Sequence, residues 1–208
     1  MSVALHQELG DPRTVLYKLT VKQYHEMIAK GLLAEGEPYE LLDGNVVRKD
    51  RSHAGDDPMT VGHENAFVVM KLNELNARLR KMGFHLRPQQ PLSLPPDDEP
   101  EPDAAIVRGK PADYADHHPT ATDVVCVIEA ADSSLRRDRT TKLEIYQSAG
   151  IGRSVIINLP DRVVEIYLRT NSAKGRFAKP VILTATQNME LLESEGKHLS
   201  VPVRSLLP

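Results

Sequence analysis

Residues 123–158 decide the fold, and they read DVVCVIEAADSSLRRDRTTKLEIYQSAGIGRSVIIN. Residues 124–128 are apolar without alternation, which is typical of a strand that is covered on both faces. A polar turn and a helix follow, and we expect Asp138 to be the N-cap of this helix and Gly150 to end it. Residues 154–158 then form a second strand of the same kind. Two buried strands joined by a helix predict a parallel crossover unit.

The segments on either side of this unit predict one mixed β-sheet flanked by helices, a mixed α/β fold. The length of 208 residues fits a polar arm at residues 1–15 followed by a single domain at residues 16–208. Apolar positions 68, 72, 75, 79 and 82 predict one helix over residues 63–81, which packs on the sheet or on a partner helix. The remaining elements are a helix capped by Thr20, a hairpin around Asp43-Gly44, an edge strand within residues 85–94, strands at 102–108, 162–169 and 176–185, and a closing segment at 201–208.

The composition excludes several classes of function. Aromatic residues make up 4% of the chain and Trp is absent, which argues against a surface that stacks RNA bases. The formal net charge of -3 gives no basic footprint for nucleic acid, although a local basic patch is compatible with it. The single cysteine, Cys126, excludes an intramolecular disulfide, and its apolar neighbours predict a buried side chain. Neither a signal peptide nor an apolar run of membrane-spanning length is present, so we expect a soluble, cytoplasmic protein.

An acid and an amine meet at the end of the first buried strand. Lys142, Tyr146 and Ala149 are spaced i, i+4 and i+7, so they share one stripe of the helix. If Tyr146 is buried against the sheet, Lys142 points inward toward Glu129. A lysine rarely faces inward without a partner. The pair is therefore either part of a reactive site or a lysine that snorkels beside a nearby acid.

Asp103 adds a second carboxylate. It follows Pro102 at the start of an apolar strand, a position where aspartate is commonly just a turn residue. If that strand lies beside residues 124–128, two carboxylates and an amine converge. Two close carboxylates repel each other unless one is protonated or a cation neutralises both. Hard oxygen ligands with open positions suit Mg²⁺ or Mn²⁺, and a lysine beside them would orient or help to deprotonate a water.

The order Pro102-Asp103, Glu129, Lys142 resembles the PD-(D/E)XK nuclease superfamily, with the lysine moved from the position of Ala131 to the following helix. More closely, the chain resembles the Uma-two family of bacterial proteins that are similar to restriction endonucleases. The matching pieces are YELLDG at 39–44, the loop leading to His63, PDAAIV at 102–107, VIEAADSSLRRDRTTKLEIYQSAGI at 127–151, and then SVIIN and VVEIY. Where the family pattern has Ser-Pro-Ser after the glutamate strand, this chain has Asp132-Ser133-Ser134, which changes the turn that aims the ligands.

The resemblance implies a restriction-endonuclease-like core with a divalent-metal phosphodiesterase site. Asp103, Glu129 and the backbone carbonyl of Ala130 would hold Mg²⁺ or Mn²⁺. Lys142 would position the attacking water and stabilise negative charge in the transition state. Glu40 would be an additional acid that acts through a water on the metal, or else a cross-strand partner within its hairpin.

Two auxiliary positions have open interpretations. His63, at the expected helix start, matches a family histidine or is a surface cap. Arg139, together with Arg136 and Arg137, is the nearest approach to a basic patch. These arginines would contact phosphates or would balance the acids of the same segment. The loop at 48–62 carries Asp56 and Asp57, which do not favour a phosphate backbone.

Three functions follow from these residues. The leading hypothesis is a Mg²⁺-dependent endonuclease that hydrolyses DNA phosphodiester bonds with a metal-activated water, and a homodimer that cuts both strands is compatible with it. The first alternative is a binding or assembly module that keeps the nuclease fold with little or no cleavage, and the second is a hydrolase of a small phosphodiester. The intact set of Asp103, Glu129 and Lys142 favours an enzyme. The negative net charge favours the binding module, and the absence of a basic surface is compatible with a small substrate.

Overall fold

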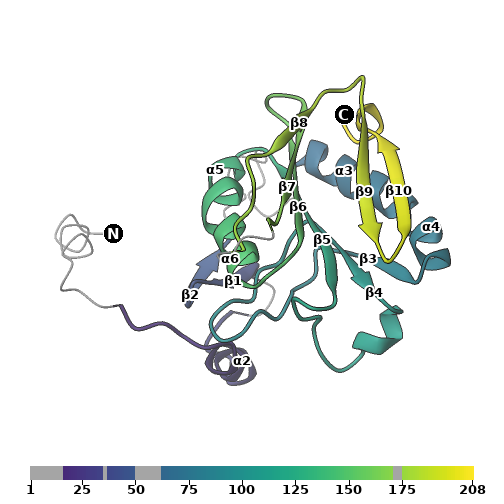
Figure 1. Ribbon diagram of the computed structural model, residues 1–208. Coiled ribbons are helices and arrows are strands. Elements are labelled where there is room, and N and C mark those ends of the chain that lie inside the picture. Colours follow the sequence, from purple (N-terminus) through teal and green to yellow (C-terminus); the bar gives the residue numbers. More distant parts are fainter. Residues whose placement is uncertain (1–15, 35–36, 50–61, 171–174) are drawn as a thin grey trace.

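The computed structural model describes residues 16–34, 37–49, 62–170 and 175–208 (Figure 1). The predicted arm at 1–15 and most of the predicted loop at 48–62, including Asp56 and Asp57, lie outside the described residues. A mixed sheet of six strands forms the centre, in the order β3-β4-β5-β6-β7-β8. Its strands are β3 (Phe84–Pro88), β4 (Ala104–Arg108), β5 (Val124–Ala131), β6 (Arg153–Asn158), β7 (Val163–Leu168) and β8 (Val181–Leu183).

The strand pairing agrees with the crossover predicted from residues 123–158. β5 and β6 are parallel, whereas the other neighbouring strands of this sheet are antiparallel. β3 lies at one edge, as its prolines predict. β5 continues to Ala131, so Glu129 lies inside the strand and not at its end as expected.

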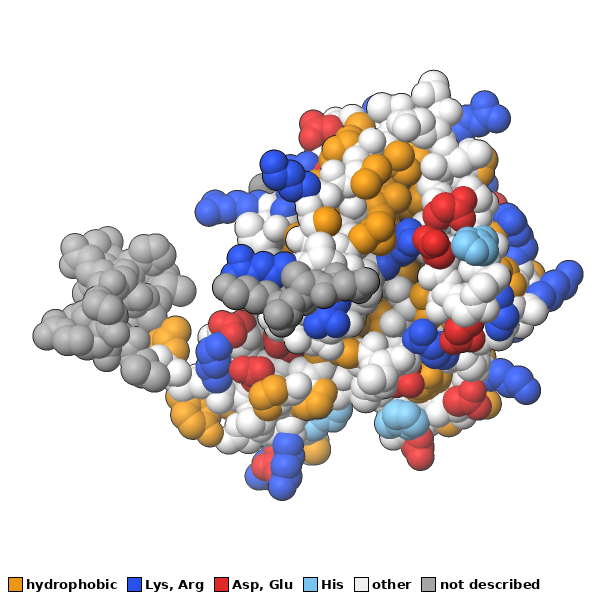
Figure 2. All heavy atoms as spheres, in the orientation of Figure 1, with side chains coloured by type: hydrophobic (Ala, Val, Ile, Leu, Met, Phe, Trp, Pro, Cys, Tyr) orange, Lys and Arg blue, Asp and Glu red, His pale blue; other side chains and the backbone are white. Residues whose placement is uncertain are grey.

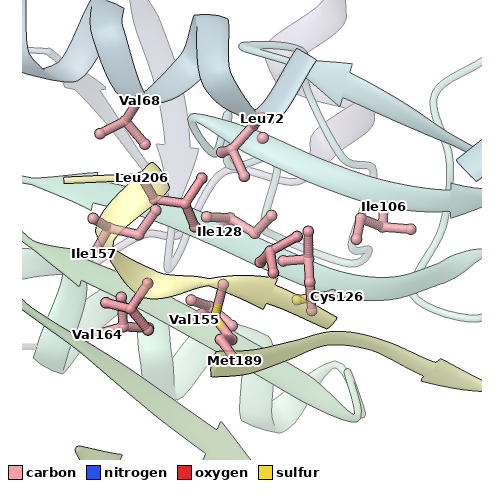
Figure 3. Packing of buried hydrophobic residues seen from close by; sticks show 14 of the residues in the cluster. Val68, Leu72, Ile106, Cys126, Ile128, Val155, Ile157, Val164, Met189 and Leu206 are labelled. Carbon is pink, nitrogen blue, oxygen red and sulfur yellow. The ribbon is translucent and has the colours of Figure 1, made fainter. Parts of the chain in front are cut away.

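One face of the sheet packs against α3 (His63–Glu74), α4 (Asn76–Lys81) and a C-terminal hairpin of β9 (Asn188–Ser194) and β10 (Lys197–Pro202) (Figure 1). Figure 3 shows Val68 and Leu72 of α3 close to Ile128 of β5, and Met189 of β9 packs in the same cluster. The apolar stripe of the 63–81 segment therefore packs on the sheet, which is the first of the two alternatives left open by the sequence. Cys126 is buried in this cluster, as predicted.

The predicted 63–81 helix is divided at Leu75, which is a correction to the single continuous helix. Leu75 donates to the carbonyl of Leu72, three residues earlier, so the chain tightens at this point. The Oδ1 atom of Asn76 accepts a hydrogen bond from the Leu86 amide of β3 at 3.1 Å. The break between α3 and α4 is thus accompanied by a hydrogen bond to β3.

The opposite face of the sheet packs against α6 (Leu143–Ser148), which follows the short helix α5 (Leu135–Arg137) and a π-helical turn at Asp138–Lys142 (Figure 1). Because side chains alternate along a strand, Val127, Glu129 and Ala131 face α6, whereas Cys126, Ile128 and Ala130 face α3. The helix begins at Leu135, so the prediction that Asp138 is its N-cap was wrong. Gly150 ends the helix in the left-handed region, at φ 87°, as predicted.

The N-terminal elements are α2 (Val21–Ala29) and a separate hairpin of β1 (Tyr39–Leu42) and β2 (Asn45–Arg48). Thr20 caps α2 in a capping box with Gln23, as predicted. Asp43 and Gly44 both have positive φ, as a tight hairpin turn requires. Two 3₁₀ turns, Pro111–Tyr114 and Val203–Ser205, complete the elements, and none of the helices in the described ranges is long and apolar enough to span a membrane.

Candidate active site

A row of side chains crosses the α6-facing side of the sheet. The register pairs Glu129 of β5 with Ile156 of β6, and Ile156 with Glu165 of β7. On the other side of β5, Ala104 pairs with Ile128, so the antiparallel register continues to place Asp103 opposite Glu129. The amide nitrogen of Asp103 lies 3.4 Å from Glu129 Oε2. The strand order thus brings together the two carboxylates that the sequence singled out.

The π-helical turn and α6 direct two further side chains at Glu129. Lys142 Nζ lies 3.2 Å from Glu129 Oε1, and the Tyr146 hydroxyl donates to the same oxygen at 2.6 Å. Lys142 is 3% exposed and Tyr146 1% exposed, so neither side chain reaches solvent. Their spacing of four residues puts them on the inward stripe predicted from the sequence.

Glu40 reaches the same lysine from the β1–β2 hairpin. Its Oε1 lies 3.0 Å from Lys142 Nζ and accepts a hydrogen bond from the Glu101 amide at 2.8 Å. Its Oε2 is buried and has no hydrogen-bond partner among the described residues. The residue opposite Glu40 in the hairpin is Val47, so the alternative role as a polar cross-strand partner is not seen.

Two charged side chains near the site were not recognised from the sequence. Asp138 is 3% exposed and accepts a hydrogen bond from the Ser134 hydroxyl at 2.6 Å. Its spacing of four residues from Lys142 was the available signal, since both belong to the inward stripe. Lys49 follows β2, and its ammonium lies 2.9 Å from Glu101 Oε1. No periodic pattern marks Lys49, because the hairpin is placed by contacts with a distant segment.

The cluster contains more acids than bases, and this changes its ionisation. Burial raises the pKa of Glu129 to about 8; the charge of Lys142 opposes the rise, and the charges of Asp138 and Asp103 add to it. Burial also raises the pKa of Asp138. Burial works against the charged form of Lys142, but the surrounding carboxylates, Glu129 first and then Glu40, outweigh it and raise its pKa. Lys142 therefore remains protonated at neutral pH.

The donor set fits a divalent cation bound through oxygen. Asp103 Oδ2 accepts from the Ala130 amide at 2.8 Å, and Glu129 Oε1 already holds two donors. One oxygen of each carboxylate, Asp103 Oδ1 and Glu129 Oε2, has no closer hydrogen bond within the described chain than the 3.4 Å contact named above. The Ala130 carbonyl accepts from Asn65 at 2.9 Å and retains a second lone pair.

The described ranges contain no group of three or more His, Cys, Asp or Glu side chains arranged to hold a metal ion. Two carboxylates and a carbonyl are hard oxygen ligands of the kind that Mg²⁺ takes while it keeps several waters. A bound cation would favour the ionised form of these crowded acids.

The two auxiliary residues are not joined to the carboxylates of the candidate site. His63 is the first residue of α3 and its side chain is exposed. Arg139 binds Glu165 of β7 through both Nε, at 3.1 Å, and Nη2. Asp161 lies 3.9 Å from the same guanidinium. Arg139 is thus committed to acids of the neighbouring strand region rather than to the site.

Comparison with known proteins places the chain in a family. The model of the Uma2 family, described as "Putative restriction endonuclease", matches residues 21–203. The chain belongs to the Uma2 family. This Uma2 protein is also similar to a crystal structure described as that of a "putative nuclease belonging to DUF820" from Anabaena variabilis. The TM-score is 0.64 and the identity 14%, over 90% of this chain and 97% of that chain.

At this identity the likeness of the two structures concerns the fold. It confirms the predicted core, a mixed sheet flanked by helices as in a nuclease-like structural neighbour. The family match confirms the resemblance inferred from the sequence pieces. No curated protein matches the chain in sequence.

Proposed function

We propose that this Uma2 protein is a divalent-metal-dependent endonuclease that hydrolyses phosphodiester bonds in DNA. The observation that carries the proposal is the convergence of Asp103, Glu129 and Lys142 in a buried cluster that holds more acidic than basic side chains. The description of its family as restriction endonucleases supports it. In this proposal Asp103, Glu129 and the Ala130 carbonyl hold Mg²⁺ or Mn²⁺. The bound cation supplies the Lewis acid that activates the attacking water and neutralises phosphate charge.

Lys142 acts as a cation and hydrogen-bond donor, and not as a base. Its raised pKa keeps the ammonium charged, so it is suited to stabilise negative charge that develops on the phosphate, and it would hold the attacking water by exchanging one of its three present acceptors. Glu40 holds Lys142 through Oε1. Its second oxygen, Oε2, is the acceptor that remains for a water or for a proton released during the reaction.

The charge of the surface restricts how DNA would be bound. On the face shown in Figure 2, basic and acidic side chains are interspersed and form no broad basic surface. Arg136 and Arg137 of α5 follow the strand that carries Glu129, and the charge of Arg137 acts on Asp138. The Arg137 Nε atom is buried without a partner within the described ranges. We assign these two arginines to phosphate contacts. A homodimer that would cut both strands stays a prediction.

Calorimetry with Mn²⁺ tests the metal site. We expect the wild-type protein to bind Mn²⁺ and Asp103→Ala to weaken binding by more than about 100-fold, because even residues that only hydrogen-bond to metal ligands contribute roughly 10- to 100-fold. Asp116→Ala is the matched control, since Asp116 is a carboxylate whose side chain is 90% exposed and pairs with His117. A wild-type protein that binds no Mn²⁺ would refute the proposal.

Cleavage assays with the wild-type protein and Lys142→Ala separate the three functions. Nicking of supercoiled plasmid that is lost in Lys142→Ala supports a DNA endonuclease. Hydrolysis of bis(p-nitrophenyl) phosphate without plasmid nicking supports an enzyme for small phosphodiesters. Mn²⁺ binding with neither reaction supports the binding module, which the formal net charge of -3 favours.

A further inference from the structure

Tyr146 contacts the candidate metal ligand Glu129 directly. Its hydroxyl donates to Glu129 Oε1 at 2.6 Å, and its ring packs with Val127 and Ile151 in a buried apolar cluster. Because the ring is enclosed, the hydroxyl has a fixed position relative to β5. The bond joins a side chain of the helix to a carboxylate of the central sheet.

The bond determines which oxygen of Glu129 is left open. Rotation of a glutamate carboxylate about its last torsion is soft, so hydrogen bonds decide its orientation. Lys142 alone is a weak guide, since its ammonium is shared between Glu129 Oε1 at 3.2 Å, Glu40 Oε1 at 3.0 Å and the Glu101 carbonyl at 3.3 Å. The shorter bond from Tyr146 holds Oε1 toward the helix. Oε2 is then the oxygen beside Asp103.

The Tyr146 hydroxyl orients the Glu129 carboxylate without adding charge to the site. A second lysine or an arginine in its place would hold the carboxylate equally well, but its positive charge would repel a divalent cation. A neutral donor orients the ligand and leaves the negative charge of the cluster to the cation. Tyrosine supplies both the apolar ring that the cluster buries and the donor that the carboxylate needs.

Glu165 provides an internal comparison, because it also accepts a tyrosine hydroxyl. Tyr167 donates to Glu165 Oε2 at 2.8 Å, while Arg139 and Asn158 supply the other donors. Both oxygens of Glu165 are occupied, so here the tyrosine completes a closed network. At Glu129 the tyrosine and the lysine converge on one oxygen, and the other accepts only a long contact of 3.4 Å from the Asp103 amide.

We propose that Tyr146 is a positioning residue of the candidate site, whose hydroxyl holds Glu129 so that Oε2 is presented to the cation beside Asp103. The inference rests on the proposed function for the identity of the cation. It goes beyond that function by assigning a role to a residue that does not itself touch the cation or the substrate.

Tyr146→Phe and the matched variant Tyr167→Phe test the inference in the full chain. Each keeps its ring and removes one buried hydroxyl, so both should lower the unfolding midpoint in EDTA by a similar amount, about 2–6 °C. Calorimetry with Mn²⁺ should separate them. We expect roughly 10- to 100-fold weaker binding for Tyr146→Phe and binding within about twofold of wild type for Tyr167→Phe. A crystal structure of metal-free Tyr146→Phe should show the Glu129 carboxylate rotated or in two conformers.

The outcomes distinguish this inference from the proposed function. If the wild-type protein binds Mn²⁺ and Tyr146→Phe binds it equally well, only the positioning role is overturned. Equal weakening in both variants, an unchanged Glu129 carboxylate, or a Tyr146→Phe protein that is recovered only unfolded would each make the hydroxyl merely structural. If the wild-type protein binds no Mn²⁺, the proposed function and this role fail together.

Discussion

Glu129 and Glu165 lie in one row of the central sheet, separated by Ile156, and both are buried on the side that faces α6. Each accepts hydrogen bonds from a basic side chain of the same helical turn and from a tyrosine hydroxyl. These partners are Lys142 and Tyr146 for Glu129, and Arg139 and Tyr167 for Glu165. The two carboxylates are therefore built from similar parts.

The pKa values of the two carboxyl groups nevertheless shift in opposite directions. Burial works against the charged form of Glu165, but hydrogen bonds from Arg139, Asn158 and Tyr167 outweigh it and lower its pKa. At Glu129 burial is the larger influence and the charges of Asp138 and Asp103 add to it, so its pKa is raised to about 8 although Lys142 and Tyr146 act against the rise. The comparison teaches that the depth of burial, set against the number of donors and the charge of the neighbours, separates an anchor of the fold from a candidate ligand of the same residue type.

The largest effect on stability is expected at Glu165, which with Arg139, Asn158 and Tyr167 forms the anchor of the fold. Glu165→Ala leaves Arg139, Asn158 and Tyr167 without their acceptor, and breaking a buried charged network in this way costs about 3–5 kcal/mol. Because the Arg139 side chain is 40% exposed and can regain water, we expect the lower end, about 3 kcal/mol. Urea denaturation in EDTA measures the loss, and Mn²⁺ affinity of the folded protein should stay within about threefold of wild type. A stable Glu165→Ala protein that no longer binds Mn²⁺ would place Glu165 in the site and break the comparison.

An effect of opposite direction is expected at Glu129 in the metal-free protein. With a folded pKa of about 8 against an ordinary 4.5, the folded state keeps a proton that the unfolded chain releases between these values. The carboxyl group therefore stabilises the fold fully below pH 4.5, and this contribution is lost as the pH rises through about 8. Glutamine does not ionise, so Glu129→Gln should unfold a few degrees above wild type at pH 9 and close to it at pH 4.5.

Thermal unfolding of both proteins in EDTA from pH 4.5 to pH 9 measures this difference. Glu165→Gln is the control with the opposite sign, because a lowered pKa stabilises the fold above the ordinary value and is lost as the pH falls. A Glu129→Gln protein that is less stable than wild type at pH 9 would show that Lys142 alone compensates the buried charge.

Local patterns predicted the elements of the fold well. The cap at Thr20, the turn at Asp43-Gly44 and the two-sided strands of residues 123–158 each depend on neighbours in sequence. The inward stripe of Lys142 and Tyr146 was also readable, because a helix repeats every 3.6 residues. The convergence of Asp103 with Glu129 could be predicted only on the condition that their strands are neighbours. Local sequence patterns do not determine the order of strands in a sheet.

The missed features depend on contacts between distant segments or on ambiguous residues. The helix break at Leu75 accompanies a bond from β3 to Asn76. Aspartate is a preferred N-cap residue, so the residue type of Asp138 favoured a cap. The structure shows it instead as a buried acid. The β9–β10 hairpin was not predicted, although Glu195 and Gly196 share the positive φ of Asp43 and Gly44. Glutamate is not a usual turn residue, and the signal was therefore weak.

The smallest expected effect concerns Arg139, which lies three residues before Lys142 but pairs with Glu165. If it belongs to the anchor, Arg139→Ala should cost about 1 kcal/mol of stability, because a half-exposed ion pair contributes little. It should leave the salt dependence of DNA binding unchanged. A residue that neutralises one phosphate contributes about 0.9 to the slope of log affinity against log salt. Arg136→Ala is the matched control, since Arg136 is exposed and we assign it to phosphate contacts.

Titration of a short duplex at several salt concentrations, in Ca²⁺ to prevent cleavage, compares the two variants. Arg136→Ala should flatten the slope by roughly one contact, whereas Arg139→Ala should match wild type. Equal flattening in both would move Arg139 to the DNA-binding surface and would make its bond to Glu165 one that DNA exchanges for phosphate. An unchanged slope for Arg139→Ala would instead mean that one helical turn serves two purposes: Lys142 provides charge for the chemistry, and Arg139 holds the turn on the sheet so that Lys142 reaches Glu129.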